Sequence, residues 1–262
     1  MSVYGNDTLP YVTQALESLY KQSKKVDIFI QEDGVLKKEV STYLDNHLLS
    51  RKIKYLGKRT KNLGLAKSLN ELLQIVSRKY KYIARMDADD ISISNRMEIQ
   101  YNYLEEHPKV DIVGAYIEEF SYIMNYSKVV IYPLDHQKMF LFFAKRVPLA
   151  HVTVMYRSKF FEKAGFYPTS SPTNEDTLMW VRGFKNDCRF ANIPEVLVRV
   201  RVSETFFKRR GGFKKAWSDL KDRIYVIQTL GYNVRVYLYA LALFFVNIAP
   251  AKIKLYLYKS FR

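Results

Sequence analysis

The first half of the chain alternates between two hydrophobic periods, and this alternation constrains the fold more than any other feature. Segments 11–20 and 62–80 carry apolar residues at helical spacing, whereas "VDIFIQEDG" (26–34) and "KYIARM" (81–86) are short β-rich runs. Strands and helices in alternation build doubly wound sheets, so we expect an α/β fold with a mostly parallel sheet. This half also predicts helices over 41–49 and 93–107 and strands over 52–56 and 110–120.

Acidic residues stand where two of these predicted strands end. Asp33, between Glu32 and Gly34, follows the first, and "DADD" (87–90) follows the second. Ligands of such sheets bind beyond the carboxyl ends of the strands. Asp33 therefore suits a hydrogen bond to a nucleotide base or ribose, although a plain turn has the same composition.

The "DADD" turn places Asp87 and Asp89 two residues apart. Two carboxylates at one point repel unless a cation lies between them. Mg²⁺ and Mn²⁺ take oxygen ligands and are often shared between carboxylates and substrate phosphates. The turn therefore predicts a divalent-cation site, and the alternative is a helix N-terminus capped by Asp90 or Ser92.

The segment 121–207 is mixed and loop-rich, with a strand that leads into a turn expected over 149–158 and a helix expected after Thr173 or Asn174. Glu175 and Asp176 open that helix, where either carboxylate could be a general base or an ordinary first-turn acid. His151 and Trp180 are residue types found more often in cores than in catalysis. Four arginines could bind a diphosphate or form a solvated basic face: Arg199, Arg201, Arg209 and Arg210.

The net charge of +16 is concentrated at the C-terminal end, because 208–262 holds 12 Lys/Arg and 2 Asp/Glu. This excess favours anionic partners such as phosphates, anionic lipid or nucleic acid. The uncharged run 236–251 is 16 residues long, shorter than the roughly 20 that a membrane span needs. We expect this run to form a helix that lies in the membrane interface and is flanked by basic residues, and the alternative is a helix packed on the core. The single Cys188 excludes an internal disulfide and, with no secretory signal visible, indicates a cytoplasmic protein.

These signals occur together in one order, and that ordered set resembles a family 2 glycosyltransferase of the GT-A fold. More narrowly, it is similar to the bacterial enzymes of capsular and exopolysaccharide assembly, the amylovoran type. The resemblance covers roughly 1–215. The stretches that carry it are "MSVYGND", "ALESLYKQS", "IFIQEDG", "NLGLAKSLN", "IARMDADDISISNRMEIQ", "LAHVTVMYR", "NEDTLMWVRG" and "VRVRVSETFFKRRGG".

The resemblance implies a role for each candidate residue. Asp33 would bond the base, Asp87 would face the ribose, and Asp89 would bind the metal on the diphosphate. Asp176 would be the catalytic base that deprotonates the acceptor hydroxyl. Asn62 and Arg85 complete the nucleotide-sugar side, and His151, Glu175 and Trp180 belong to the acceptor side, with Trp180 packing or stacking by the sugar.

The resemblance also implies a reaction, which is the inverting transfer of one sugar from a UDP-sugar with Mn²⁺ or Mg²⁺. No Gln-x-x-Arg-Trp motif of processive synthases is present. The expected acceptor is a saccharide linked to polyprenyl diphosphate, met at the inner face of the plasma membrane. Expected regions are 1–207 for the transferase domain, with 1–120 on the nucleotide-sugar side and 121–207 on the acceptor side, and 208–262 for the basic helical tail.

The chain departs from the family pattern at three places. Of the usual first strand only Ser2-Val3-Tyr4 remains, Val152 stands where Pro is common, and Thr177 stands where an aromatic residue is usual. Two other functions compete. A nucleotidyltransferase would also use a divalent cation, but the Gly-rich phosphate loop expected of one is missing. A nucleic-acid-binding protein would suit the charge, but no recognised motif accompanies it.

Overall fold

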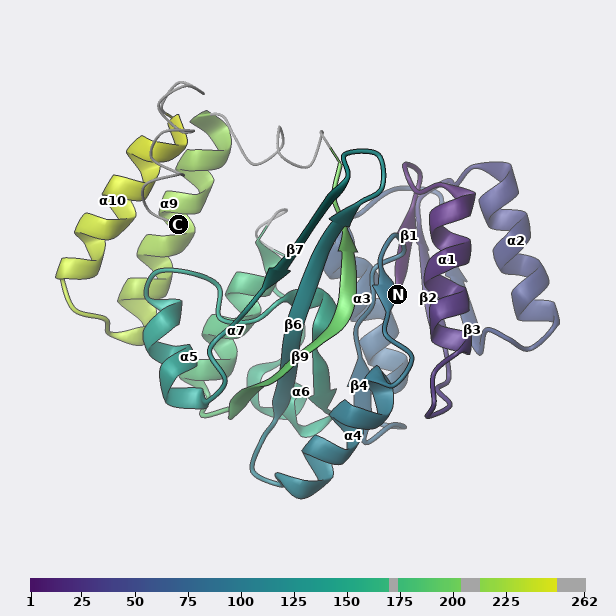
Figure 1. The fold of residues 1–262 in the computed structure, drawn as a ribbon, viewed down its shortest axis with the longest axis horizontal. Helices are drawn as coiled ribbons and strands as arrows, with labels where there is room; N and C mark the ends of the chain where they lie inside the picture. Colours follow the sequence, from purple (N-terminus) through teal and green to yellow (C-terminus); the bar gives the residue numbers. More distant parts are fainter. Residues whose placement is uncertain (170–173, 204–212, 249–262) are drawn as a thin grey trace.

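The computed structural model of the chain describes residues 1–169, 174–203 and 213–248 (Figure 1). Its N-terminal part is a small parallel sheet in the order β1-β2-β3, with Val3 opposite Glu32 and Gln31 opposite Gly57. The predicted alternation of strand and helix is confirmed through this part. Its elements are β1 (Ser2–Tyr4), α1 (Leu9–Tyr20), β2 (Phe29–Asp33), α2 (Lys38–Leu49), β3 (Tyr55–Lys58) and α3 (Leu65–Val76).

A second, six-stranded sheet has the order β4-β8-β6-β9-β5, with β7 paired to β6. Here the expected parallel pairing holds only between β6 and β9, and the other four pairings are antiparallel. The sheet is therefore mixed rather than mostly parallel. Its strands are β4 (Tyr82–Ala84), β5 (Ile91–Ser92), β6 (Ile112–Ser121), β7 (Tyr126–Val130), β8 (Met155–Arg157) and β9 (Phe190–Arg201).

Helices pack on both sheets and enclose two main hydrophobic cores. Leu16, Leu44 and Leu104, from α1, α2 and α4 (Arg96–Glu106), share one core. The other takes α3 together with Phe143 and Trp180. The helices that complete it are α5 (His136–Phe143), α6 (Lys159–Ala164) and α7 (Glu175–Lys185). The 3₁₀ turn η1 (His151–Thr153) contributes Val152 to the first core.

Two local predictions are refined in the second half. The segment 149–158 begins as η1 before it becomes β8, because the Thr153 hydroxyl donates to the Ala150 carbonyl and holds a turn there. The helix α7 begins after Asn174, one of the two predicted caps. Thr173, the other, lies outside the described residues.

The basic tail is helical where the structure describes it. Helices α9 (Phe213–Leu230) and α10 (Arg235–Ile248) lie side by side, and α9 packs against α7 (Figure 1). Their shared core is small, with Leu220, Ile227 and Ala240 buried in it. Arg209 and Arg210 lie outside the described residues. In the described part of the chain no helix is long and apolar enough to cross a membrane.

Candidate active site

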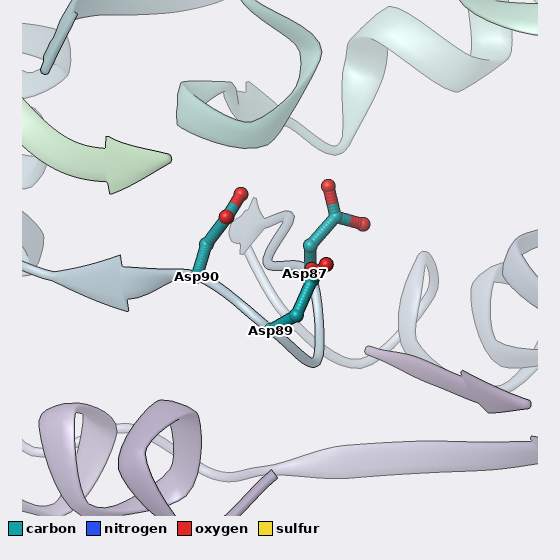
Figure 2. A group of neighbouring side chains, drawn as sticks. All are labelled: Asp87, Asp89 and Asp90. Carbon is teal, nitrogen blue, oxygen red and sulfur yellow. The ribbon is translucent and has the colours of Figure 1, made fainter. Parts of the chain in front are cut away.

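Asp87, Asp89 and Asp90 lie on the loop that joins β4 to β5, and their carboxyl groups extend to the same side of it (Figure 2). One carboxylate oxygen of each lies within 4.8 Å of the others. The loop is held at both ends, because β4 pairs with β8 and β5 pairs with β9. Strands β8 and β9 thus fix the loop so that its three carboxylates stay close together.

The alternative interpretation of these aspartates as helix caps is wrong. Helix α4 begins at Arg96, and its N-cap is Asn95. Ser92 belongs to β5, and the Asp90 carboxylate accepts a hydrogen bond from the Arg201 backbone N–H at 2.8 Å. The acidic loop is therefore separate from the helix that follows it.

Burial and neighbouring negative charge raise the pKa values of two carboxyl groups on this loop. Burial raises the pKa of Asp89, and the charge of Asp87 raises it further. Burial raises the pKa of Asp90 well above its usual range, and both neighbouring carboxylates add to this. A bound divalent cation would relieve the repulsion, and clustered carboxylate oxygens are the hard ligands that Mg²⁺ and Mn²⁺ prefer. The residues present therefore fit such an ion.

Arg85 lies behind the acidic loop and makes a two-pronged ion pair with Asp87. Its side chain is only 6% exposed, and its backbone N–H donates to the Val154 carbonyl at 3.0 Å, where β4 leads into the loop. A planar guanidinium matches a carboxylate in this geometry. Arg85 thus fixes the direction of the Asp87 carboxylate.

Arg201, which was predicted either to bind a diphosphate or to lie on a solvated basic face, instead holds the same loop from β9 in this structure. Besides the backbone bond to Asp90, its Nε donates to the Asp89 carbonyl at 3.1 Å and its Nη2 donates to Gln14 at 2.7 Å. Arg199 instead pairs with Glu118, with Nε and Oε2 2.8 Å apart. Both arginines are thus bound within the protein in this structure, Arg201 to the acidic loop and Arg199 to Glu118 of β6.

Asp33 ends β2 and is 3% exposed, with its carboxylate bound to the segment that leads into α3. It accepts hydrogen bonds from the Leu63 N–H at 2.7 Å and from the Gly64 N–H at 3.0 Å. Its ion pair with Arg59 is 2.7 Å long. Asn62 lies in this segment and accepts from the Gly64 N–H at 3.2 Å. Asp33, which was predicted to bond the base, therefore orders the turn that carries Asn62.

Glu175 and Asp176 lie in the first turn of α7, as predicted. The Asp176 carboxylate accepts from the Thr177 N–H at 2.6 Å. Burial raises the pKa of Asp176, and it also raises the pKa of Glu175, where the charge of Asp176 adds to it. A carboxyl with a raised pKa is a stronger proton acceptor once it is ionised, which suits a general base.

His151 and Trp180 occupy one cluster but differ in exposure. His151 is partly exposed, and its Nε2 lies 2.7 Å from the Tyr167 hydroxyl. Trp180 is 0% exposed, with its ring edge-on to His151 at 5.8 Å between centroids. Trp180 was expected to pack or stack by the sugar, and stacking is wrong for this structure because its ring has no free face. It packs behind His151.

Two residues that no sequence pattern singled out belong to the site. Burial raises the pKa of Asp7 to about 7, and the charges of Asp89 and Asp87 contribute to this rise. Asp7 follows the end of β1, so the strand-end rule that selected Asp33 could have found it. Tyr167 is buried and also bonds the Tyr156 hydroxyl at 2.5 Å, a contact between distant segments that no local pattern marks.

The positive charge of Arg85 acts on both the acidic loop and the start of α7. Burial raises the pKa values of Asp89 and Asp176 and lowers that of His151, and in all three the charge of Arg85 acts to lower the pKa. The charge of Asp87 also contributes to the raised pKa of Glu175. The acidic loop and the start of α7 therefore lie within one electrostatic environment centred on Arg85.

Comparisons with known proteins agree with the family that the sequence motifs resemble. Residues 1–165 match the family described as "Glycosyl transferase family 2". The chain is 30% identical to the amylovoran biosynthesis glycosyltransferase AmsE of Erwinia amylovora, over 100% of this chain and 97% of the relative. It is 28% identical to the UDP-Gal:alpha-D-GlcNAc-diphosphoundecaprenol beta-1,3-galactosyltransferase of Escherichia coli, over 99% and 94%.

Solved structures show the same fold at low sequence identity. S. aureus TarS 1–349 superposes with a TM-score of 0.66 at 16% identity, covering 97% of this chain and 75% of that one. The mannosyltransferase PcManGT from Pyrobaculum calidifontis, in complex with GDP-Man and Mn²⁺, gives 0.64 at 13% identity, covering 99% and 78%. The fold class expected from the sequence is therefore confirmed as GT-A, and the chain belongs to glycosyltransferase family 2.

Proposed function

We propose that this glycosyltransferase moves one sugar from a UDP-sugar to a saccharide carried on polyprenyl diphosphate, with inversion at the anomeric carbon. The donor and acceptor classes are supported by the relative from Escherichia coli, whose name specifies UDP-Gal and a diphosphoundecaprenol acceptor. A TarS structure is also solved with UDP-GlcNAc. The observation that carries the proposal is that the charge of the buried Arg85 acts on both Asp89 of the acidic loop and Asp176 of α7.

On the donor side, Asp89 would hold Mn²⁺ or Mg²⁺, with Asp87 directed to the ribose by Arg85. The ion supplies electrostatic stabilisation for the negative charge that develops on a departing diphosphate. Asp33 at the end of β2 would bind the base, and Asn62, on the turn that Asp33 orders, would complete the nucleotide-sugar side. In this arrangement Arg85 sets the direction of Asp87 without taking part in the chemistry.

On the acceptor side, Asp176 would accept the proton of the attacking hydroxyl. A sugar hydroxyl is a poor nucleophile until a positioned base takes that proton. Glu175 and His151 lie beside this base and would orient the acceptor. One base and one donor site suffice for a single displacement, and we propose one sugar per encounter.

Membrane contact would take place through the outer face of α10. Leu238, Leu241, Phe245 and Ile248 are exposed and recur every three or four residues, which places them along one stripe of the helix. The chain from 208 to 262 carries an excess of ten positive charges, from 12 Lys/Arg against 2 Asp/Glu. An apolar stripe beside positive charge is suited to an anionic bilayer surface, here the inner face of the plasma membrane.

The catalytic assignment is tested by UDP release from a panel of UDP-sugars, in detergent, with and without Mn²⁺. We expect metal-dependent release from one sugar, at least a hundredfold lower in Asp89→Asn. Asp45→Asn is the matched control, because Asp45 is an ion-paired aspartate on α2 outside the site. Equal activity of Asp89→Asn and the unmodified chain would refute the metal assignment.

The membrane assignment is tested by sedimentation with vesicles of phosphatidylglycerol and phosphatidylethanolamine. The change Phe245→Glu should reduce the bound fraction several-fold. Leu49→Glu, at an 81% exposed position on α2, should leave it unchanged. Equal binding by all three proteins would exclude the α10 stripe as the docking face.

A further inference from the structure

Three side chains form a hydrogen-bonded network that runs from the interior to the surface of the site. The Nε2 of His151 lies 2.7 Å from the Tyr167 hydroxyl, and that hydroxyl lies 2.5 Å from the Tyr156 hydroxyl. Both tyrosines are buried, whereas His151 is partly exposed. We call these three residues the His151 network. A substrate therefore reaches this network through the imidazole of His151.

The short turn η1 holds the backbone of His151. The Thr153 N–H and the Thr153 hydroxyl both donate to the Ala150 carbonyl, at 3.0 Å and 2.8 Å. The same hydroxyl accepts from the Ala115 N–H of β6 at 3.0 Å. Trp180 packs edge-on against the imidazole, with the two ring planes 79° apart. The protein therefore holds both the backbone and the ring of His151 before any substrate binds.

Asn70 of α3 holds Tyr167 with both ends of its amide. Its Oδ1 accepts from the Tyr167 N–H at 2.8 Å, and its Nδ2 donates to the Tyr167 carbonyl at 2.9 Å. Tyr167 lies in the loop after α6, where no helix or strand fixes its position. The two bonds from Asn70 supply that constraint, so the Tyr167 hydroxyl stays within reach of the His151 ring.

The number of protons determines the direction of the hydrogen bonds in the His151 network. Each tyrosine hydroxyl brings one proton, and each of the two contacts uses one proton. A proton on Nε2 would be a third, and one of the three would then have no acceptor among the described residues. Buried donors without an acceptor are costly, so Nε2 carries no proton. Tyr156 therefore donates to Tyr167, and Tyr167 donates to Nε2.

Without a proton on Nε2, His151 is a neutral imidazole whose single proton is on Nδ1. The surroundings favour this neutral form, because burial lowers the pKa of His151 well below its usual range and the charge of Arg85 lowers it further. Nδ1 bonds none of the residues that the structure describes, and the side chain is partly exposed. The Nδ1–H group is therefore free to donate to a ligand.

We propose that Tyr167 is a positioning residue that fixes His151 as a neutral hydrogen-bond donor, with its Nδ1–H directed to an oxygen of a bound sugar. A sugar presents several hydroxyl and ring oxygens, and a fixed donor favours the orientation that places one of them against it. Burial raises the pKa values of Tyr156 and Tyr167, and the charge of Asp176 adds to both, so the network lies near the proposed base. In the proposed function, on which this part of the inference rests, the oxygen belongs to the acceptor saccharide.

The opposite tautomer of His151 would present a lone pair instead of a proton at the same place. An unprotonated Nδ1 accepts a hydrogen bond, so it would compete with Asp176 for the proton of the attacking hydroxyl. The Tyr167 hydroxyl therefore determines whether His151 donates or accepts. Tyr167 has this effect through the far side of the imidazole, without contact to the substrate.

The tautomer is measured by nitrogen-15 NMR of the chain 1–262 labelled at histidine, without substrate. Protonated and unprotonated nitrogens of an imidazole resonate far apart. The chain has four histidines, and His151→Asn and His151→Gln each identify the His151 signals by removing them. We expect a protonated Nδ1 and an unprotonated Nε2 at neutral pH. A protonated Nε2 in the unmodified chain would overturn the proposal.

The role of Tyr167 is tested with Tyr167→Phe, which removes the hydroxyl that donates to Nε2. The Nε2 signal of His151 should then move toward the protonated position. Tyr232→Phe is the matched control and should leave that signal in place, because the Tyr232 hydroxyl donates to the Phe140 carbonyl beside the same core. An unchanged signal in Tyr167→Phe would overturn the role of Tyr167. If Tyr167→Phe does not fold, the signals of the unmodified chain decide the outcome.

Two substitutions of His151 test which atom donates. Asn carries its amide nitrogen on Cγ, as His carries Nδ1, whereas the Gln nitrogen lies one bond further, near the position of Nε2. His151→Asn should therefore keep at least tenfold more kcat/KM for the acceptor than His151→Gln, with equal KM for the UDP-sugar. Equal losses would overturn the donor role. A difference confined to the KM for the UDP-sugar would overturn the acceptor saccharide as the source of the oxygen.

The NMR and transfer measurements separate this inference from the proposed function. If the unmodified chain transfers no sugar, the proposed function fails, and the NMR signals still show which nitrogen of His151 is protonated. If the chain transfers sugar while Nε2 is protonated, the proposed function stands and the inference about Tyr167 fails.

Discussion

The Arg85 guanidinium binds both carboxylate oxygens of Asp87, which lies two residues further along the chain. The pair is located where β4 ends and the acidic loop begins. This pair links the interior to the catalytic surface, because Arg85 is almost fully buried while Asp87 is one-third exposed. The charge of Arg85 also acts on Asp176 and His151 across the site. Replacing Arg85 should therefore affect both the proposed donor side and the proposed acceptor side of the site.

Replacing Arg85 by Met should lower both stability and activity. Removing one partner of a buried ion pair costs 3–5 kcal/mol, and the exposure of Asp87 reduces this to about 2 kcal/mol. The Tm should therefore fall by about 5 °C, and UDP release should fall at least tenfold because Asp87 loses its direction. Arg199→Met removes an arginine–carboxylate pair outside the acidic loop and should retain activity. Full activity of Arg85→Met would contradict this role.

Replacing Asp176 by Asn should remove the base while leaving the donor site intact. General-base catalysis contributes about 10²–10⁴-fold, so sugar transfer should fall by that factor while UDP-sugar affinity changes little. Calorimetry for binding and a transfer assay separate the two quantities. Glu39→Gln changes a first-turn acid of α2 and is the control. A parallel loss of binding in Asp176→Asn would indicate a donor-side residue instead.

Asp7 should make the metal-free protein less stable as pH rises. Its folded pKa of about 7 lies above the ordinary value of 3.8, so the folded state binds more protons in this window. Stability therefore falls from pH 4 to pH 7 through this group. Asp7→Asn removes that fall and keeps an acceptor for the Tyr4 N–H. Thermal melts in a chelator should show a Tm advantage for the variant that grows with pH, and a constant difference would argue against the assignment.

Two glycines beside Asp33 should respond differently to alanine. Gly34 and Gly64 have φ of +87° and +92°, where a side chain costs about 1–2 kcal/mol. A Cβ on Gly34 would also lie 2.8 Å from the Asn62 backbone nitrogen, whereas a Cβ on Gly64 meets nothing within 4 Å. Gly34→Ala should therefore melt at a lower temperature than Gly64→Ala. The reverse order would show that the turn 62–64 moves away freely.

Much of the fold was predictable because it rests on local patterns. Helical and strand periods correctly placed the elements from α1 to β6 except the short strand β5, and the strand-end rule selected Asp33, Asp87 and Asp89. The prediction of a cap at Thr173 or Asn174 correctly located the start of α7, whose N-cap is Asn174. These features depend on residues within a few positions of one another, so their spacing can be read directly from the sequence.

Other features depend on segments that are far apart. The antiparallel strands of the second sheet, the burial of Trp180 and the bonds from Arg201 to the acidic loop, 111 positions away at Asp90, have no local signature. The sequence by itself determined the α/β alternation and the acidic residues at the strand ends. Only the tertiary structure decided that Arg85 joins the two sides of the site, because burial and long-range charge arise when distant strands pack together.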